Sequence, residues 1–261
     1  MKSTSQLIAL ALLAAAPGAF GATLFYDGFN YPNGDLVGQG PWTITGTSTV
    51  NPIQVSGARV SLLTTGQDAN GAFASAVTNL DGTSFYIGLS INISAAQSSG
   101  DYFLHVTPNP GNSSAFYQRL FVRSLGAGFQ LGYLETSGSG TITYGVTELV
   151  FNTDYRVVVA YNSIAGDTND TASVYVNPTD LSIEGNNTPY LTDTWTTTTA
   201  ETNIVGSVNL RQGTAANAPT LTVDDLAISK TFGDVAVIPE PSVPALGVLG
   251  FLAILAVRRR S

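Results

Sequence analysis

The sequence predicts an all-β fold, an antiparallel β-sandwich of the jelly-roll kind, with one apolar segment at each end of the chain. Three observations support this prediction. Apolar and polar residues alternate in short runs along the chain. Turn-forming residues separate the runs, and the chain contains 27 Gly and 12 Pro. No long amphipathic helical pattern occurs between residues 23 and 234.

The clearest strand pattern lies in residues 85–94. Every second residue from Phe85 to Ile93 is apolar, and polar or small residues stand between them. Because successive side chains of a strand point to opposite faces of a sheet, this pattern is typical of a half-buried antiparallel strand. Similar runs predict further strands at residues 102–107, 117–123, 129–135, 141–146, 155–161, 172–176, 204–210 and 221–228.

The middle of the chain is expected to form a single β-sandwich domain, residues 22–234. No linker-like change of composition divides it, and a domain of about 200 residues buries enough surface to be stable without disulfides. This matters because the sequence contains no cysteine. The threonine-rich residues 192–202 are predicted to form a long loop, and residues 235–242 are predicted to form a linker.

The charge of the domain excludes some partners. Residues 22–234 contain 17 acidic and 6 basic residues, and no cluster of basic residues occurs within them. Phosphate backbones are bound mainly through clustered lysines and arginines, so no nucleic-acid partner is expected.

The first 21 residues predict a signal peptide. Lys2 precedes the apolar run LIALALLAAA, which is too short to span a bilayer and is followed by small residues. Ala19 and Gly21 supply the small side chains that signal peptidase requires, so cleavage is expected just before Ala22. The secretion machinery and signal peptidase are therefore expected partners.

The other end of the chain has three parts in a fixed order. Pro239-Glu240-Pro241 comes first, and the apolar residues 243–257 follow as a predicted single transmembrane helix. The last part, residues 258–261, contains Arg258, Arg259 and Arg260 and is predicted to be a basic cytoplasmic tail. Positive charges stay on the cytoplasmic side, so the β domain is expected outside the membrane.

This order of motifs closely resembles the PEP-CTERM sorting signal. The resemblance implies that Pro239, Glu240 and Pro241 are recognised and processed by an exosortase, a membrane-embedded cysteine transpeptidase. It also implies that the three terminal arginines retain the precursor in the membrane. The expected destination is the cell surface or the exopolysaccharide matrix, and the chain is expected to be a substrate of the exosortase. Prolines also keep residues 238–242 out of helices and sheets, which leaves the motif accessible.

A second resemblance concerns the fold. Residues 151–178, FNTDYRVVVAYNSIAGDTNDTASVYVNP, look like the central hairpin of LamG-like, concanavalin A-type jelly rolls. Residues 25–29 and 223–228 also resemble the first and last strands of such domains in PEP-CTERM proteins. The chain carries Tyr155-Arg156 where the LamG pattern often has Trp-His.

No catalytic residues are predicted. Glycosidases need paired carboxylates, and the four glutamates of the domain, Glu135, Glu148, Glu184 and Glu201, form no such pattern. His105 is the one histidine of the sequence, and no Gly-x-Ser-x-Gly motif accompanies it, so a structural role is expected. The chain is therefore expected to be noncatalytic and to need no cofactor.

Two binding alternatives remain open beside a structural or adhesive role at the cell surface. A lectin-like role would need exposed aromatic rings, and Trp42, Trp195 and Tyr190 lie in turn-rich stretches. Calcium could be held by Asp167, Asn169 and Asp170 or by Asp224 and Asp225, although Asp, Asn and Gly are also ordinary turn residues. The turn interpretation is preferred, so no metal ligands are assigned. The runner-up function is thus a carbohydrate-binding module, with or without calcium.

Overall fold

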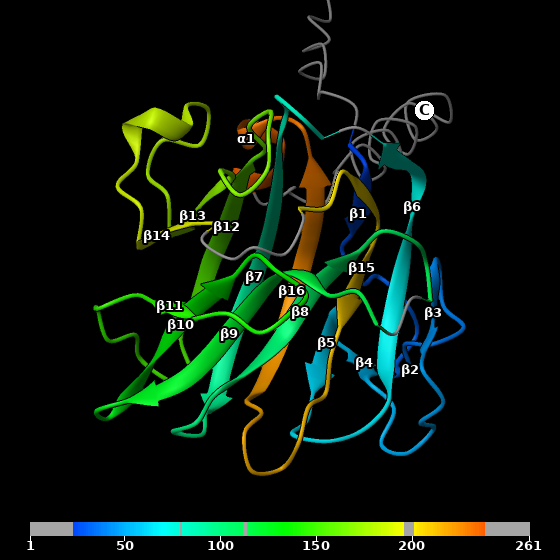
Figure 1. Cartoon of the computed structure of the whole chain (residues 1–261). Coiled ribbons are helices and arrows are strands. Elements are labelled where there is room, and N and C mark those ends of the chain that lie inside the picture. Colours follow the sequence, from blue (N-terminus) through cyan, green and yellow to red (C-terminus); the bar gives the residue numbers. More distant parts are fainter. Residues whose placement is uncertain (1–22, 79, 112–113, 196–200, 238–261) are drawn as a thin grey trace, which may run out of the picture.

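The alternating runs form two antiparallel sheets that pack face to face (Figure 1). The computed structural model describes residues 23–78, 80–111, 114–195 and 201–237. Within these residues the prediction of an all-β antiparallel sandwich is confirmed, because the helices comprise one 3-10 turn, Glu184–Asn186, and one short α-helix, α1 (Phe232–Ala236).

The first sheet has nine strands. Eight follow one another in the order β14-β13-β12-β7-β16-β5-β4-β2, and β1 pairs with β16. Their bounds are β1 (Phe25–Asp27), β2 (Gly34–Asp35), β4 (Gln54–Ser56), β5 (Arg59–Leu62), β7 (Ser84–Ala95), β12 (Asp154–Asn162), β13 (Thr171–Val176), β14 (Leu191–Thr194) and β16 (Thr220–Ser229).

The second sheet has seven strands in the order β11-β10-β9-β8-β15-β6-β3. Their bounds are β3 (Trp42–Thr45), β6 (Asp68–Thr78), β8 (Asp101–Thr107), β9 (Tyr117–Leu125), β10 (Gly128–Leu134), β11 (Thr143–Tyr144) and β15 (Ile204–Leu210). Figure 1 shows these strands crossing in front of the nine-stranded sheet.

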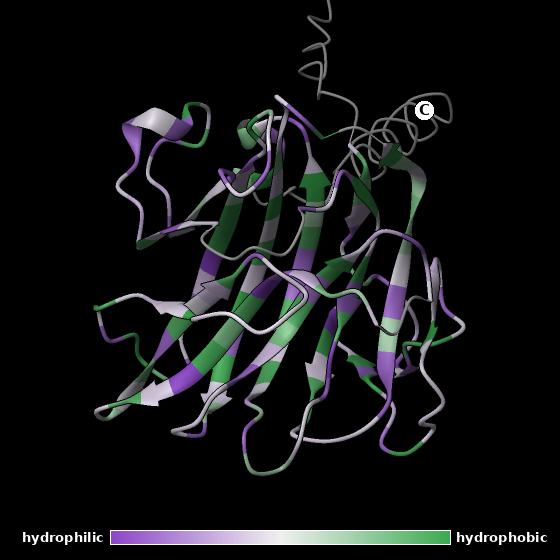
Figure 2. Cartoon of the chain, viewed as in Figure 1, coloured by the Kyte–Doolittle hydropathy of each residue, from purple (hydrophilic) through white to green (hydrophobic). Residues whose placement is uncertain are grey.

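The main core lies between the two sheets and follows the predicted alternation. The five apolar residues of β7 that the pattern identified, Phe85, Ile87, Leu89, Ile91 and Ile93, are all buried there. Leu120 and Val122 of β9 face them from the other sheet, while Phe121 belongs to a separate cluster on the outer surface. Figure 2 shows the same alternation along the strands as hydrophobic residues in green.

The first and last strands of the domain lie side by side. Phe25 of β1 pairs with Ile228 of β16 in antiparallel register. Helix α1 follows β16 and packs on the outer face of the nine-stranded sheet, where Phe232, Val235 and Ala236 form a small apolar cluster with residues of β12, β13 and β16. A Cβ at Gly88 would overlap the carbonyl oxygen of Val235, so the glycine permits this close approach. The first two residues of the predicted linker, Val235 and Ala236, are therefore helical and buried.

Some local predictions were wrong. The strand expected at residues 141–146 is confined to Thr143–Tyr144. The stretch predicted as a long loop, residues 192–202, begins with three residues of strand β14. Strands β2 to β6 were not predicted individually, since their short or alanine-rich segments show little alternation.

The segments predicted for targeting lie outside the described residues. These are the signal peptide (1–21), the Pro-Glu-Pro motif, the apolar segment 243–257 and the basic tail 258–261. Within the part of the chain that the structure describes, no helix is long and apolar enough to cross a membrane.

Candidate binding groove on the seven-stranded sheet

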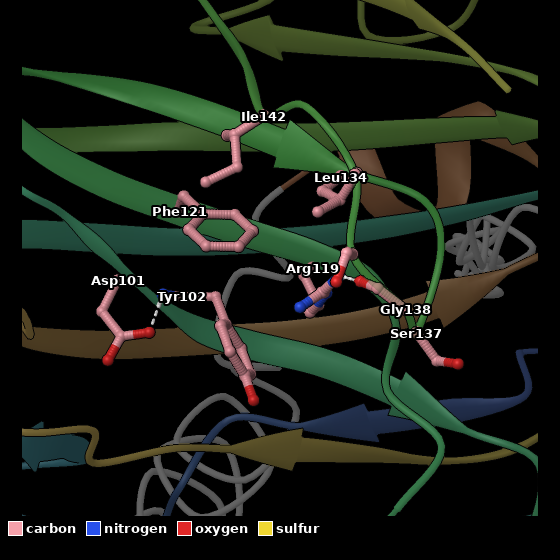
Figure 3. Close-up of a pocket in the computed structure, with 10 residues that line it drawn as sticks. Asp101, Tyr102, Arg119, Phe121, Leu134, Ser137, Gly138 and Ile142 are labelled. Atoms are coloured by element: carbon pink, nitrogen blue, oxygen red, sulfur yellow. Dashed lines mark hydrogen bonds between the residues drawn. The ribbon is translucent and has the colours of Figure 1, made fainter. Parts of the chain in front are cut away.

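An open groove of about 630 Å³ lies on the outer face of the seven-stranded sheet (Figure 3). This volume is within the roughly 300–1,000 Å³ that is typical of ligand sites. Strands β8 and β9 and the segment between β10 and β11 provide its walls. The lining residues are Asp101, Tyr102, Arg119, Phe121, Leu134, Ser137, Gly138, Ser139, Gly140 and Ile142.

The alternation of β9 explains why charged and aromatic groups meet here. Arg119, Phe121 and Arg123 share the outer face of the strand, while Leu120 and Val122 enter the core. Tyr102 of β8 lies opposite Phe121 in the register of the two strands, and their ring centroids are 5.3 Å apart. The groove is therefore built on a small apolar cluster that is separate from the main core.

Arginine side chains cover the ring faces in this cluster. The Cζ atom of Arg211 lies 4.2 Å from the ring centroid of Tyr102, and that of Arg119 lies 5.4 Å from it. Arg123 lies in the same way over Tyr144, at 3.7 Å. These are favourable cation–π distances, and a ring covered by a guanidinium is not free to stack on a ligand.

Arg119 is held by the neighbouring loop. Its Nη2 atom donates to the carbonyl oxygens of Thr136 and Gly138 at 2.6 Å and 2.7 Å; Figure 3 shows the guanidinium beside Gly138. Burial lowers the pKa of Arg119, and the nearby charge of Arg211 acts in the same direction, while Tyr102, Glu135 and Asp101 oppose the shift.

Arg119 has no ionic partner within the described residues. The ion pairs found there are Arg59–Asp154, Arg59–Asp224 and Arg211–Asp101. Its buried Nε atom also has no hydrogen-bond acceptor in the part of the chain that the structure describes. The groove thus contains a partly desolvated positive charge that has no carboxylate of the described residues within ion-pair distance, although the charges of Glu135 and Asp101 act on it.

Asp101, in contrast, is already paired. Its Oδ1 atom lies 2.8 Å from Nη1 of Arg211, and it also accepts the backbone N–H of Tyr102. Among the described residues that line the groove, Asp101 is the one acid and Arg119 the one base. Since Asp101 is paired with Arg211, Arg119 is the charged residue of the groove lining that has no ion pair among the described residues.

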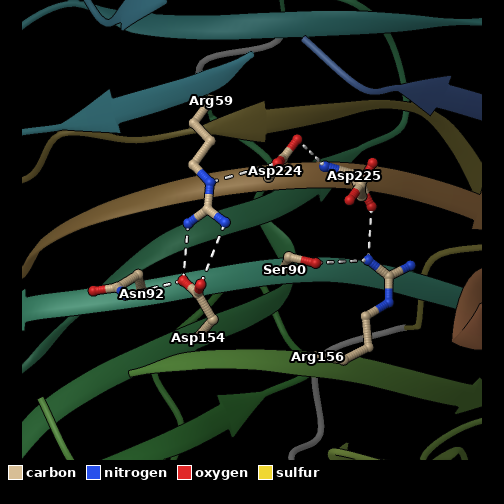
Figure 4. Close-up of polar contacts among 7 residues, drawn as sticks. All are labelled: Arg59, Ser90, Asn92, Asp154, Arg156, Asp224 and Asp225. Atoms are coloured by element: carbon tan, nitrogen blue, oxygen red, sulfur yellow. Dashed lines mark hydrogen bonds and ion pairs between the residues drawn. The ribbon is translucent and has the colours of Figure 1, made fainter. Parts of the chain in front are cut away.

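A second polar cluster lies on the outer face of the nine-stranded sheet (Figure 4). Arg59 of β5 contacts Asp154 of β12 at 2.8 Å and Asp224 of β16 at 3.6 Å. The register of β16 shifts between Asp224 and Ala227, and Asp225 has a positive φ of 47°. This bulge brings two consecutive aspartates into the same polar cavity of about 340 Å³.

Arg156 is the buried part of this second cluster. Its guanidinium donates to the carbonyl oxygens of Val235 and Asp225 and to Oγ of Ser90. Burial lowers its pKa to about 10. Burial, together with repulsion from Asp225, raises the pKa of Asp224 to about 6. Both arginines of this face are bound to protein groups, and Arg156 connects α1 to the sheet through the carbonyl oxygen of Val235.

The aromatic residues considered for sugar stacking are buried or partly buried. Trp42 is 1% exposed, stacks on Phe29 and donates from Nε1 to Asp27 at 2.6 Å. Trp195 is 2% exposed. Tyr190 is half-buried against Gly145, and its hydroxyl donates to the carbonyl oxygen of Thr147. The two tryptophans therefore offer no exposed ring for stacking although their neighbours are turn-forming residues, and Tyr190 is only partly exposed.

The structure gives His105 a buried position between Tyr102 and Phe116. Neither ring nitrogen has a hydrogen-bond partner among the described residues, and burial lowers the pKa of His105 to about 3.

The four glutamates make different local contacts. Glu148 accepts the N–H of Ala127, Glu184 accepts the hydroxyls of Tyr86 and Tyr175, Glu201 accepts the N–H groups of Asn169 and Asp170, and Glu135 is buried.

Two of the aspartates considered for calcium, Asp170 and Asp224, have partners within the protein. Asp170 accepts the hydroxyl of Tyr161 and the N–H of Ile164, so both its oxygens are used within the turn. Asp224 faces Arg59. Among the described residues, no group of three or more acidic or histidine side chains has the arrangement of a metal site.

The residues predicted for sorting lie outside the described part of the chain; they are Pro239, Glu240, Pro241, Arg258, Arg259 and Arg260.

The groove was not predicted from the sequence. A usable signal was present in Arg119-Leu-Phe121-Val-Arg123, because two of the six basic residues of the domain alternate there with an aromatic residue on one face of a strand.

Comparisons with known proteins identify no family for the chain. No protein-family model matches it, and no curated protein matches its sequence. Among solved structures, the CBM2 module of the evolved Dit of Lactobacillus casei BL23 phage J-1 is 9% identical, with a TM-score of 0.46 over 79% of this chain and 94% of that one. The binding domain of botulinum neurotoxin serotype D is 11% identical, with a TM-score of 0.45 over 73% of this chain and 43% of that one. The SAP-like pentraxin of Limulus polyphemus is 14% identical, with a TM-score of 0.41 over 65% and 74%. The chain thus spans less than half the length of the neurotoxin chain, and none of these likenesses assigns a ligand or a site.

Proposed function

We propose that the chain is an exported, noncatalytic component of the cell surface or exopolysaccharide matrix, and that its β-sandwich binds carbohydrate in the groove on the seven-stranded sheet. The observation that carries the binding role is the groove, which places donors, an acceptor and hydroxyl groups around an opening of about 630 Å³. Arg119 supplies donors, Asp101 supplies an acceptor, and Ser137 and Ser139 supply hydroxyls. Sugars present alternating donors and acceptors, which such a set of side chains matches.

The proposed destination rests on the resemblance of the C-terminal residues to the PEP-CTERM signal. In this proposal the secretion machinery exports the chain, signal peptidase removes residues 1–21, and the helix 243–257 holds the precursor in the membrane. An exosortase-like transpeptidase then acts at Pro239, Glu240 and Pro241. Helix α1 ends at Ala236, so the motif follows the folded domain closely.

We also propose that the sandwich has the LamG-like, concanavalin A-type topology. The support is that β12 and β13 pair as the hairpin that the resemblance implies, with Val158 opposite Tyr175. The noncatalytic role is supported by the local hydrogen bonds that occupy Glu148, Glu184 and Glu201, three of the four glutamates considered for glycoside hydrolysis.

The binding role is tested by measuring retention of the full-length protein, kept in detergent, on a panel of immobilised neutral and acidic polysaccharides. We expect saturable binding to at least one of them and competition by the same polysaccharide in solution. Loss of this binding in Ser137→Trp, which fills the opening of the groove, would assign it to the groove. Failure to bind any polysaccharide would contradict the proposal and leave a structural or adhesive role without a discrete site.

The sorting role is tested in the native host by fractionation and intact-mass analysis of wild type and Glu240→Ala. We expect the mature wild-type protein to lack residues 243–261 and the variant to keep them in the membrane fraction. A full-length tail in both proteins would indicate an ordinary membrane anchor.

A further inference from the structure

We propose that the ligand of the groove is a carboxylate-bearing polysaccharide, and that Arg119 receives its carboxylate. This inference rests on the proposed function and narrows it to a chemical class. It starts from the unusual state of Arg119, which is half-buried, hydrogen-bonded to the carbonyls of Thr136 and Gly138, and without an ion pair among the described residues.

The position of Arg119 is unusual for a domain with an excess of acidic residues. Residues 22–234 carry 17 acidic and 6 basic residues, so most of the surface repels an anion. Three of the six basic residues, Arg119, Arg123 and Arg211, nevertheless project from the same outer face of the seven-stranded sheet, around Tyr102 and Tyr144. Half of the basic residues of the domain are therefore gathered around this groove.

The aromatic rings of the groove favour an acidic ligand over a neutral one. Neutral sugars are usually bound by stacking on an open aromatic face. Here Arg211 and Arg119 both lie over Tyr102, which is 8% exposed. The groove therefore lacks an open stacking surface at Tyr102 and offers the guanidinium of Arg119, a charged donor to which a carboxylate can hydrogen-bond.

The remaining groups favour a polysaccharide over an acidic peptide. Asp101 lies in the groove, and its carboxylate can accept hydrogen bonds from the hydroxyl groups that sugars carry and the side chains of an acidic peptide lack. Ser137 and Ser139 add two hydroxyls on the opposite wall. A chain of sugar rings with one carboxylate per residue and several hydroxyls fits this mixture.

The experiment compares polygalacturonate with the same polymer after its carboxylates have been reduced to alcohols, using the full-length protein in detergent. We expect carboxyl reduction to weaken binding at least about tenfold, because a charge-assisted hydrogen bond to Arg119 is lost. We also expect the affinity for polygalacturonate to fall as salt is raised. This ligand-side comparison uses an unchanged protein, so it does not depend on the folding of a variant.

Arg119→Gln should weaken polygalacturonate binding by a similar factor and should leave the reduced polymer unaffected. The matched control is Lys230→Gln, which removes one positive charge at an exposed residue outside the groove and should change affinity less than about twofold. Thermal unfolding of both variants checks that the domain remains folded.

The outcomes separate this inference from the proposed function. Equal binding of both polymers would overturn the inference and support carbohydrate binding in general. Binding of poly-glutamate as tight as that of polygalacturonate would show recognition of charge alone and would also overturn it. Absence of binding to polygalacturonate, alginate and every neutral polymer would overturn both proposals.

Discussion

The two outer faces of the sandwich both carry arginines, but they hold them in different ways. On the nine-stranded sheet, Arg59 is paired with Asp154 and Asp224, and Arg156 is bonded to three protein oxygens beneath α1. On the seven-stranded sheet, Arg119 and Arg123 lie over aromatic rings and have no ion pair within the described residues. The arginines of the nine-stranded sheet therefore stabilise the fold through contacts with protein groups. On the seven-stranded sheet, the positive charge of Arg119 lies in an open groove.

The largest difference is expected between Arg156 and Arg123. Arg156→Met should lower the free energy of unfolding by about 3 kcal/mol, because it leaves the carbonyls of Val235 and Asp225 without donors and loosens α1. Arg123→Met should cost less, about 1 kcal/mol, since it loses a cation–π contact with Tyr144 and the hydrogen bonds to the side-chain oxygen of Gln130. Urea unfolding of the full-length variants measures both. Equal costs would show that the two faces depend on their arginines to the same extent.

A smaller effect is expected from the carboxyl of Asp224, whose pKa is raised from 3.8 to about 6 by burial and then by Asp225. Between these values the folded protein binds more protons than the unfolded chain, so this group makes the free energy of unfolding fall as pH rises from about 4 to about 6. Asp224→Asn should therefore stabilise the protein at pH 7 by about 1 to 2 kcal/mol and flatten that slope.

Asp68 in β6 is a buried carboxyl group of the seven-stranded sheet that can be compared with Asp224. Burial raises its pKa to about 6 as well, while the N–H of Gln212 and the charge of Arg211 oppose the shift. Asp68→Asn should change the same part of the pH profile in the same direction. Urea unfolding across pH 4 to 7 tests both variants, and a slope that stays unchanged in Asp224→Asn would assign the pH dependence to other groups.

The smallest effect is expected for the ion pair between Arg59 and Asp154, whose side chains are 38% and 59% exposed. Exposed pairs contribute about 0–1 kcal/mol, so Asp154→Asn should change stability by less than about 1 kcal/mol at low salt and even less at high salt. A loss above about 2 kcal/mol would mean that this pair supports the bulge at Asp224 and Asp225.

Strands were predicted correctly from the sequence where apolar and polar residues alternate regularly. Residues 85–94 and 155–161 lie at the centre of the nine-stranded sheet, where one face meets the core, so β-branched and aromatic residues mark them clearly. Strand β6 was missed because DANGAFASAVT contains small residues that show no clear period. Its place is fixed by pairing with β3 and β15, which depends on contacts distant in sequence.

The groove was harder to predict than the strands. Asp101, Arg119 and Ser137 come from three segments, and only the register of β8 and β9 and the path of the following loop bring them together. Trp42 was misjudged for the opposite reason. Its flanking residues suggest a surface turn, but its indole N–H has a buried acceptor in Asp27, which allows the whole ring to enter the core.

The central position of β16 affects how the domain can assemble over time. This strand lies between β7 and β5 and also pairs with β1, so its partners all come from residues 25–95. A chain that emerges from its N-terminus, from a ribosome or through a membrane pore, would present these strand edges unpaired until residues 220–229 arrive. Unpaired strand edges can pair with other chains and lead to aggregation. Pairing between strands that are distant in sequence, such as β16 with β1, is also slow. Folding of this domain is therefore expected to wait for almost its last residues and to depend on protection of the unfinished sheet until then.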